Sequence, residues 1–355
     1  TLCRIVGEKL AAAWGQPVIV ENKPGAGGNV GAEAAYRADP DGTHLEIVAR
    51  GLRNPWDIGF DAEFNWLGTD NDQVGGDRVF MPFRGAHFGW NHPWSADWGD
   101  TPDSPVAPVS GPLFEGSGTG LIFCDSPAFP AAYRRVFFIN DWLSKTTYLW
   151  RPQWDGAMLR PSGGAWEPFV VGGKSLFRPT DIEVGPDGAL WVLGWSSGYG
   201  AVWKNGELSN EGRVFRVATP ACTRDWRTPK RSKPMAQWTV AELIEDFDGP
   251  LPVWRTDAQE ELVRRGSTTA QELIRALQAG RLTEFQETWT AWTLARLGLH
   301  HADNRRFFEA ALASGPLVSP NLRIQSLRIL ADLPRKPGSE NTLPAIAIAQ
   351  LQSPE

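Results

Sequence analysis

The spacing of apolar residues divides most of the chain into a region of short runs and a region of helical period. The apolar runs between residues 49 and 218 are short and bounded by Gly, Pro, Asp and Asn, as at 121–123 and 136–139. Runs of this kind predict β-strands. From Thr239, which can cap a helix, apolar residues recur every three to four positions, which predicts helices over residues 237–355. A basic, proline-containing linker is predicted at 219–236.

Two stretches of the β region repeat each other. PWDIGFDAEFNWLG begins at Pro55, PTDIEVGPDGALWVL begins 124 residues later at Pro179, and a looser third copy begins at Gly120. The Gly-Pro-Asp-Gly sequence at 185–188 predicts a hairpin turn. A repeated strand-turn-strand unit is typical of a propeller, with roughly 40–50 residues in each blade. Residues 49–218 therefore predict a mainly β fold, a partial β-propeller of three to four blades with unpaired edge strands.

Residues 1–48 carry a different pattern, which predicts a small N-terminal α/β piece. A helical face formed by Ile5, Val6 and Leu10 precedes a short strand at 18–20, and a glycine turn at 25–28 leads into an Ala-rich helix. Glycines at a helix N-terminus can present backbone N–H groups to an anion, or they can simply permit a tight turn.

The amino-acid sequence of this segment resembles a known family. VENKPGAGGNVGAEA and DPDGTHL are similar to the receptors of tripartite tricarboxylate transporters, which are periplasmic solute-binding proteins for organic acids. The resemblance covers about 45 residues. It implies a fragment of one lobe, without the second wall of a ligand cleft.

Composition and charge narrow the function classes. The chain has 355 residues and a net charge of −6, and its Lys and Arg residues are scattered, which argues against nucleic acid or an anionic membrane as a partner. Eighteen Trp, 37 Gly and 28 Pro are typical of a loop-rich β protein.

Cysteine spacing and hydropathy exclude other classes. Cys3, Cys124 and Cys222 form no CxxC or CxxCH motif, so neither a structural zinc site nor a c-type haem attachment is indicated. No apolar run approaches the ~20 residues of a membrane span. No signal peptide precedes Thr1, so an expected compartment must come from resemblance.

Residues 51–90 carry the main functional resemblance. They contain an Arg-Asn-Pro corner, a strand, a Thr-Asp-Asn-Asp turn, Gly-Gly-Asp and His-Phe-Gly-Trp. This order resembles the glucose/sorbosone dehydrogenase-like β-propellers, quinoproteins that hold pyrroloquinoline quinone (PQQ) over a calcium ion. The resemblance to the propeller covers residues 49–218, and together with a HEAT-like tail it extends to about residue 330. It implies a sugar or alcohol dehydrogenase and a periplasmic or secreted location.

The same resemblance implies site residues. Arg53 and Asn54 match the pair that contacts the quinone, and Arg178 matches the first member of an arginine pair whose second position holds Thr180. A guanidinium fork and an amide donor suit the oxygens of a tricarboxylate. The turn positions that supply calcium ligands correspond to Asp70, Asn71 and Asp72. Calcium takes six to eight oxygen ligands, so these three would supply part of its shell.

The family's general base has no counterpart in the chain. That histidine lies in N-terminal blades, whereas His87 lies downstream of the predicted calcium turn. We expect His87 and His92 to be structural partners of the surrounding Trp residues. Without a base, hydride abstraction would lose about 10²–10⁴-fold in rate.

The helical region also resembles a known element. WRTDAQEELVRRG is similar to the HEAT-like tails that follow such propellers in large bacterial membrane-associated dehydrogenase-like proteins. Short amphipathic helices separated by Gly and Pro stack as an α-solenoid. We expect this helical repeat to bind a protein partner or the blades themselves.

Three hypotheses for function follow. The first is a quinoprotein-like sugar or alcohol dehydrogenase propeller, incomplete or chimeric, with PQQ and calcium as cofactors. The second is a non-catalytic binding or interaction protein built on blades and helical repeats. The third is a serine hydrolase using Ser196 of a G-x-S-x-G motif, although the loop and strand predicted after it do not match the helix that a nucleophile elbow requires.

Overall fold

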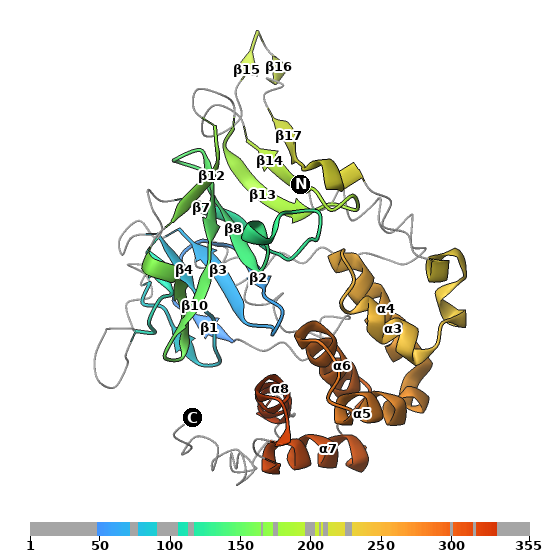
Figure 1. Cartoon of the computed structure of the whole chain (residues 1–355). Coiled ribbons are helices and arrows are strands. Elements are labelled where there is room, and N and C mark those ends of the chain that lie inside the picture. The colour runs from blue at the N-terminus through green and yellow to red at the C-terminus, as the bar shows by residue number, and fades with distance from the viewer. Residues whose placement is uncertain are drawn as a thin grey trace.

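The computed structural model of the chain places its sheets on one side and its helices on the other (Figure 1). The residues that the structure describes are 48–71, 77–90, 106–112, 117–164, 166–172, 177–195, 203–205, 207–208, 212–223, 229–298, 301–314 and 317–331. The α/β piece predicted at the N-terminus lies outside the described residues, apart from its last position. No helix in the described ranges is long and apolar enough to cross a membrane.

Three antiparallel sheets follow one another along the chain. Sheet 1 contains β2 (Pro55–Phe60), β3 (Trp66–Asp70), β4 (Arg78–Phe80) and β6 (Gly111–Pro112). Sheet 2 contains β7 (Gly118–Cys124), β8 (Val136–Asp141), β9 (Thr146–Trp150) and β12 (Glu167–Val171). Sheet 3 contains β13 (Pro179–Val184), β14 (Leu190–Gly194) and β17 (Arg213–Val217). In each sheet the strands pair in chain order, as a meander.

Smaller pairings accompany these sheets. Strand β1 (Ala49–Arg50) pairs in parallel with β5 (Ala86–His87), and two hairpins are formed by β10 (Pro152–Asp155) with β11 (Met158–Pro161) and by β15 (Trp203–Lys204) with β16 (Glu207–Leu208). The predicted turn at 185–188 joins β13 to β14. There Gly188 adopts a φ of 77°, a conformation that glycine reaches without strain.

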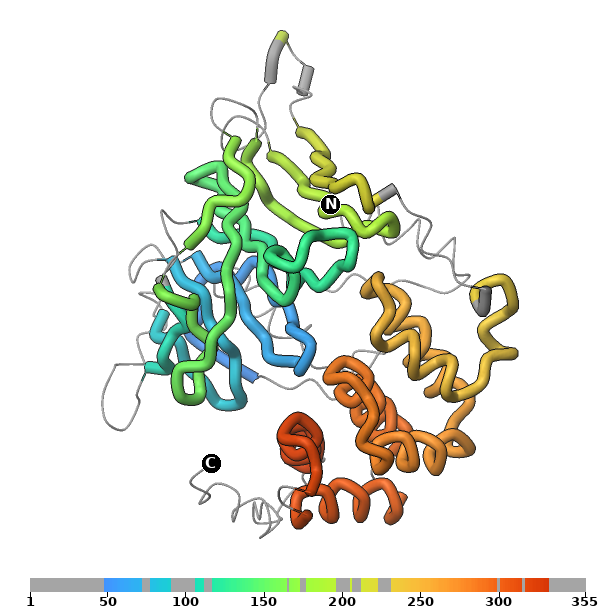
Figure 2. The backbone as a smooth tube through the Cα atoms, in the orientation of Figure 1, coloured from blue at the N-terminus to red at the C-terminus, as the bar shows by residue number. Residues whose placement is uncertain are grey.

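The sheets stack through apolar faces, with β7 next to both β2 and β13. Figure 2 follows the chain from sheet 1 in blue, through sheet 2 in green, to sheet 3 in yellow-green. The core between sheets 1 and 2 includes Leu67, Val79, Leu121 and Trp150, and a second core joins sheet 2 to sheet 3. The described strands form no closed barrel. The fold is mostly sheet with several helices, consistent with a partial propeller-like arrangement.

The part of the predicted helical region that the structure describes, up to Ala331, forms helices. Its helices are α3 (Val240–Asp246), α4 (Pro252–Arg265), α5 (Ala270–Gln278), α6 (Glu284–Arg296), α7 (Ala302–Ala313) and α8 (Pro320–Ala331). Short 3-10 helices lie at Ala131–Tyr133, Ser162–Gly164, Pro220–Thr223, Pro229–Ser232, Met235–Gln237 and Gly266–Thr269.

Thr239 begins α3 as predicted. Its hydroxyl accepts the Glu242 N–H, and the Glu242 carboxylate accepts the Thr239 N–H, so the two residues form a capping box. Most apolar residues of these helices are buried or partly buried. Ile324 is an exception, because 48% of its surface is exposed. The assignment of these helices to a HEAT-like repeat stays a prediction.

One turn of sheet 1 makes several of the contacts between the sheets and the helices. The turn between β2 and β3 is closed by Asp61, whose carboxylate accepts the N–H groups of Glu63 and Asn65. At its tip Phe64, with a φ of 57°, places its ring 5.1 Å from the ring of Trp289 on α6. From α8, Arg328 and Gln325 donate to the Glu63 carbonyl at 2.7 and 2.8 Å. The helical tail therefore packs on the sheets through this turn, residues 61–65.

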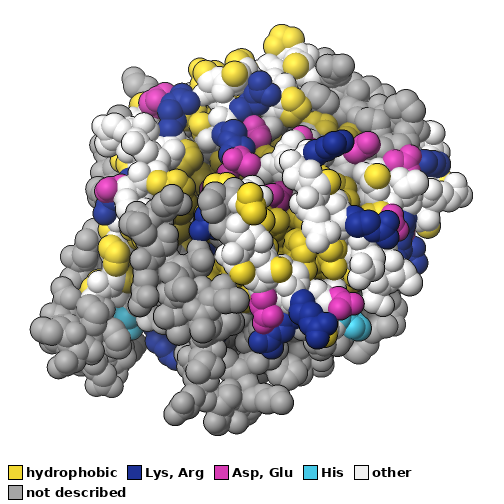
Figure 3. All heavy atoms as spheres, turned by 60° about the horizontal axis from the view of Figure 1, so that its bottom comes forward, with side chains coloured by type: hydrophobic (Ala, Val, Ile, Leu, Met, Phe, Trp, Pro, Cys, Tyr) yellow, Lys and Arg dark blue, Asp and Glu magenta, His cyan; other side chains and the backbone are white. Residues whose placement is uncertain are grey.

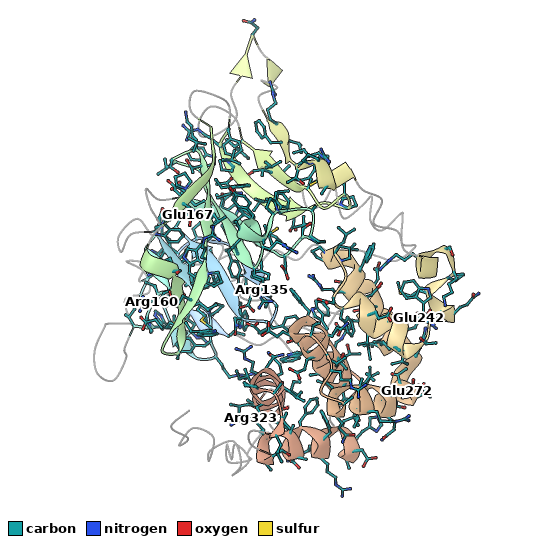
Figure 4. All side chains as sticks on the ribbon, in the orientation of Figure 1. Arg135, Arg160, Glu167, Glu242, Glu272 and Arg323 are labelled. Carbon is teal, nitrogen blue, oxygen red and sulfur yellow. The ribbon has the colours of Figure 1, made fainter. Side chains whose placement is uncertain are left out.

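An ion-pair group lies beside the turn. Arg135 contacts the carboxylates of Glu63 and Glu284 at 3.0 and 2.8 Å, and Figure 4 shows it between the sheets and the helices. Burial and repulsion from Asp61 and Glu284 raise the pKa of Glu63 to about 7. The Arg135 charge opposes this shift. Glu63 therefore binds a proton more tightly in the folded protein than in the unfolded chain.

We predict that Phe64→Ala lowers the unfolding free energy by about 2 kcal/mol, because a half-buried ring and its contact with Trp289 are lost. Urea unfolding followed by tryptophan fluorescence measures this change. The matched control is Trp154→Ala, whose ring is 48% exposed on the β10–β11 hairpin and should change little. Equal losses in the two variants would contradict the assigned interface.

We predict that stability falls as pH rises from ~4.5 to ~7, partly because folded Glu63 must give up a proton that the unfolded chain has already lost. Glu63→Gln should remove this part of the slope. Thermal melts of both proteins across pH 4.5–8 check it, with the difference between them isolating Glu63 from the other buried carboxyls. Parallel pH profiles would refute the interpretation.

Candidate functional site

The Arg-Asn-Pro corner is fixed by one buried carboxylate. Asp70, the last residue of β3, is fully buried, and its Oδ1 accepts the N–H groups of Asn54 at 2.8 Å and Arg53 at 3.1 Å. Its Oδ2 accepts from Nη2 and Nε of Arg78 at 2.8 and 3.1 Å. Four donors thus hold one side chain, and the backbone before β2 cannot move without breaking some of these bonds.

The strand register explains why Asp70 and Arg78 meet. The two residues are directly opposite each other in the β3–β4 pair, so their side chains lie on the same face. Arg78 also donates to the Gly51 carbonyl at 3.2 Å, which ties β4 to the segment before the corner. Burial raises the pKa of Asp70, while the Arg78 charge and the two amides oppose that shift.

These contacts bear on the predicted calcium ligands. A cation at Asp70 would compete with the Arg78 guanidinium, so its carboxylate does not fit a calcium site in this arrangement. The Asn71 carbonyl accepts from Nη1 of Arg53 at 3.0 Å, and the Asn71 Oδ1 is buried without a hydrogen bond from a described group. Asp72 lies outside the described residues. In the described ranges, no three His, Cys, Asp or Glu side chains gather as a metal site.

The predicted quinone-binding residues lie at the corner and at the start of β13. Arg53 and Asn54 are half-buried, and the Asn54 side chain makes no hydrogen bond within the described part of the chain. Arg178 precedes β13, with its guanidinium 4.2 Å from the ring centroid of Trp142 and its Nη1 donating to the Trp142 carbonyl at 3.1 Å.

Hydrogen bonds link sheets 1, 2 and 3 near the N-terminal ends of β2, β7 and β13. The Trp56 indole N–H donates to the Thr180 carbonyl at 2.8 Å. Thr69 donates through its hydroxyl to the Thr119 carbonyl, and Thr119 donates to the Pro179 carbonyl, both at 2.7 Å. We call the N-terminal ends of β2, β7 and β13 the inner edge. It brings the Arg53 and Arg178 segments to one end of the stacked sheets.

Sequence reasoning did not identify Trp56 or Arg78, and it named Thr180 only as the residue at the second position of the arginine pair. Trp56 and Thr180 occupy matching positions of the internal repeat, and this equivalence is a signal that they would meet. Arg78 carried a weaker signal, because it begins the strand that follows the Asp70 turn. Its pairing with Asp70 depends on a register that the sequence does not specify.

His87 packs behind the corner. Its Nδ1 accepts the Gly89 N–H at 3.1 Å, and a Cβ at Gly51 would come within 2.4 Å of its ring, so Gly51 is needed for this contact. Burial, together with Arg50 and Arg78, lowers the pKa of His87. These contacts hold His87 in the fold, and its expected partnership with Trp residues stays a prediction. His92 and Ser196 lie outside the described residues, so the predictions for them stay predictions.

The charge distribution is mixed. On the face shown in Figure 3, Lys and Arg side chains are interspersed with Asp and Glu, with no extended basic area among the coloured residues.

Comparison with known proteins found two kinds of similarity. Residues 2–64 match the tripartite tricarboxylate transporter family receptor profile, a range that extends past the predicted boundary at residue 48. A UPF0065 protein from Agrobacterium vitis is 47% identical over 52 residues, which is 15% of each chain.

The second similarity is to solved structures. A glucose dehydrogenase from Thermus thermophilus is 20% identical with a TM-score of 0.36, and the match covers 50% of this chain and 48% of that one. The soluble aldose sugar dehydrogenase of Escherichia coli is 19% identical with a TM-score of 0.34, and the match covers 50% of this chain and 48% of that one. The PQQ-bound aldose sugar dehydrogenase of Streptomyces coelicolor is 16% identical with a TM-score of 0.35, and the match covers 51% of this chain and 50% of that one.

Both resemblances predicted from the sequence are confirmed. The chain spans about half the length of the solved dehydrogenases and a much smaller share of the curated relative.

We predict that Asp70→Asn destabilises the protein by about 3–5 kcal/mol, because it leaves the Arg78 guanidinium buried without its counter-charge. Chemical unfolding in buffers with EDTA and with calcium measures the loss. The loss should be the same in both buffers if the carboxylate is structural. A loss confined to the calcium buffer would instead identify Asp70 as a metal ligand.

Proposed function

We propose that the chain is a quinoprotein-like sugar or alcohol dehydrogenase propeller whose inner edge binds a PQQ-type tricarboxylate quinone. Arg53, Asn54 and Arg178 are the proposed ligand-binding residues. The observation that carries the proposal is the hydrogen bond between Trp56 and Thr180, which brings the segments of both arginines to one end of the sheets. When bound, the quinone would supply the two-electron acceptor of the oxidation.

The electrostatics of the corner support an anionic ligand. The charge of Asp70 is balanced by Arg78, so the Arg53 charge is not cancelled by the carboxylate that fixes its backbone. Arg53 uses Nη1 on the Asn71 carbonyl and keeps further N–H donors for a carboxylate. The Asn54 amide adds neutral donors beside it. This set of donors fits the oxygens of a tricarboxylate.

The corner also holds its donors in place before a ligand arrives. Both backbone N–H groups of Arg53 and Asn54 are bound to Asp70, and the Arg178 side chain is stacked on Trp142. A fixed donor loses little conformational entropy on binding, which favours affinity.

The proposal also covers the identity of the sheets and helices. We interpret sheets 1, 2 and 3 as blades of an open propeller and helices α3–α8 as a HEAT-like tail that packs on them. A sugar or alcohol substrate and a periplasmic or secreted location follow from the resemblance of residues 51–90. Asp70 is excluded from our proposed metal ligands by its pairing with Arg78, and Asn71 and Asp72 remain the proposed calcium-binding positions.

A non-catalytic binding function is the second candidate. Of the two histidines in the described part of the chain, His87 lies behind the corner and His301 precedes α7. Neither supplies a base at the inner edge. A protein that binds the quinone without oxidising a sugar would have this arrangement.

We predict that PQQ quenches the tryptophan fluorescence of the protein on binding. Arg53→Met and Arg178→Met should each weaken the affinity for PQQ by about 10–100-fold, because each removes a charged hydrogen-bond donor. Titrations with and without calcium test both cofactors. Arg306→Met, on the exposed side of α7, is the matched control.

Two outcomes separate the candidate functions. Binding accompanied by dye-linked sugar or alcohol oxidation supports the dehydrogenase, whereas binding without oxidation supports the non-catalytic protein. Absence of binding in both titrations, or equal affinity in all three variants, would refute the proposed site.

A further inference from the structure

Sheet 3 repeats the strand pairing of sheet 1. In β2–β3, Asp57 is opposite Thr69 and Gly59 is opposite Leu67. In β13–β14, Asp181 is opposite Leu193 and Glu183 is opposite Trp191. Both pairs have a register shift at the same place, between Pro55 and Asp57 and between Pro179 and Asp181. The corresponding faces of the two sheets can therefore be compared position by position.

In sheet 1 this face is covered by sheet 2. Leu67 and Val79 are fully buried there, in the core that they share with Leu121. One carboxylate oxygen of Asp57 accepts the N–H of the next residue, Ile58. The other oxygen accepts the Leu121 N–H at 2.9 Å. Apolar contact and a backbone hydrogen bond thus join this face to the next sheet.

In sheet 3 the corresponding face is uncovered. Trp191, Leu193 and Val214 are 38%, 45% and 61% exposed, although they match the buried Leu67, Thr69 and Val79. Asp181 accepts the Ile182 N–H in the same way as Asp57, but no described group donates to its second oxygen. The opposite face, with Ile182 and Val192, is buried against sheet 2.

We name the uncovered surface the open face and define it by Asp181, Glu183, Trp191, Leu193, Val214 and Arg216. We propose that the open face packs against the open face of a second copy of this chain, forming a two-fold symmetric dimer. Continuity with the sheet 1–sheet 2 interface indicates that the occupant is a β-sheet. Sheets pack face to face at about 10 Å through interdigitated apolar side chains.

The other sheet faces favour a symmetric contact. Sheets 1 and 2 cover each other, as do sheets 2 and 3, and the remaining face of sheet 1 packs through Phe80 against Ala49, Leu52 and Phe88. Among the described sheets, the surface that a second copy can offer is therefore the open face itself. Such a contact is isologous and closes as a dimer.

The charges on the open face are self-complementary. Glu183, Trp191 and Arg216 lie in one row across β13, β14 and β17. A two-fold axis along β14 places β13 over β17 of the other copy, so Glu183 faces Arg216 of the partner subunit. Trp191 then lies near the axis.

The neighbouring charges are compatible with this pairing. Arg216 already contacts Asp187 at 2.6 Å but keeps 36% of its side chain exposed. Burial, followed by repulsion from Asp181 and Asp57, raises the pKa of Glu183, so a nearby guanidinium would offset an existing repulsion.

Sedimentation equilibrium on the full chain tests the proposal. The expected result is a mass of twice 39.1 kDa at tens of micromolar protein, with dissociation on dilution. Leu193→Arg should weaken association at least 10-fold, because it replaces an apolar side chain on β14, near the two-fold axis, with a charged one. Trp154→Arg, at an exposed aromatic position on the β10–β11 hairpin, should leave it unchanged.

A charge exchange tests the two-fold arrangement. Glu183→Arg and Arg216→Glu should each weaken the dimer, and the double variant should restore much of the affinity, while circular dichroism confirms that each variant is folded. A monomer at every concentration would overturn the proposal, as would a dimer unaffected by Leu193→Arg. Open-ended association would overturn the symmetric geometry. None of these readouts depends on quinone binding.

Discussion

The buried pair of Asp70 and Arg78 is the constraint on which the candidate site depends. A carboxylate at the end of one strand and a guanidinium at the start of the next neutralise each other, and each also binds backbone before β2. Such a pair gives little net stability over an apolar pair, but removing one partner is costly. Its contribution here is the fixed position of Arg53 and Asn54, the residues that face a ligand in the proposed site.

The second organising contact is the turn at 61–65, which carries sheet 1 into the helices. It combines an aromatic ring with carbonyl and carboxylate acceptors, so the interface is partly apolar and partly charged. The helical tail therefore packs on the sheets through these contacts. A protein partner for the tail stays a prediction.

Much of the fold follows from the sequence, because hydrophobic period and turn residues are local signals. The strands beginning at Pro55 and Pro179, the hairpin at 185–188 and the capping of α3 by Thr239 were all predictable. The pairing of Asp70 with Arg78 was not, because it requires a strand register and burial that no local pattern specifies. Thus the sequence predicted the strand that follows the corner but did not reveal what Asp70 binds.

The bonds from α8 to the turn at 61–65 have a consequence for biosynthesis. The Glu63 carbonyl and its α8 donors are separated by 262 and 265 residues, so the contact cannot form until nearly the whole described chain has been made. At ribosomal rates of about 5–20 residues per second, the turn emerges on the order of tens of seconds before its partners. During that interval Phe64 and the apolar surface around it are exposed. This surface of the nascent chain is one that a chaperone would bind.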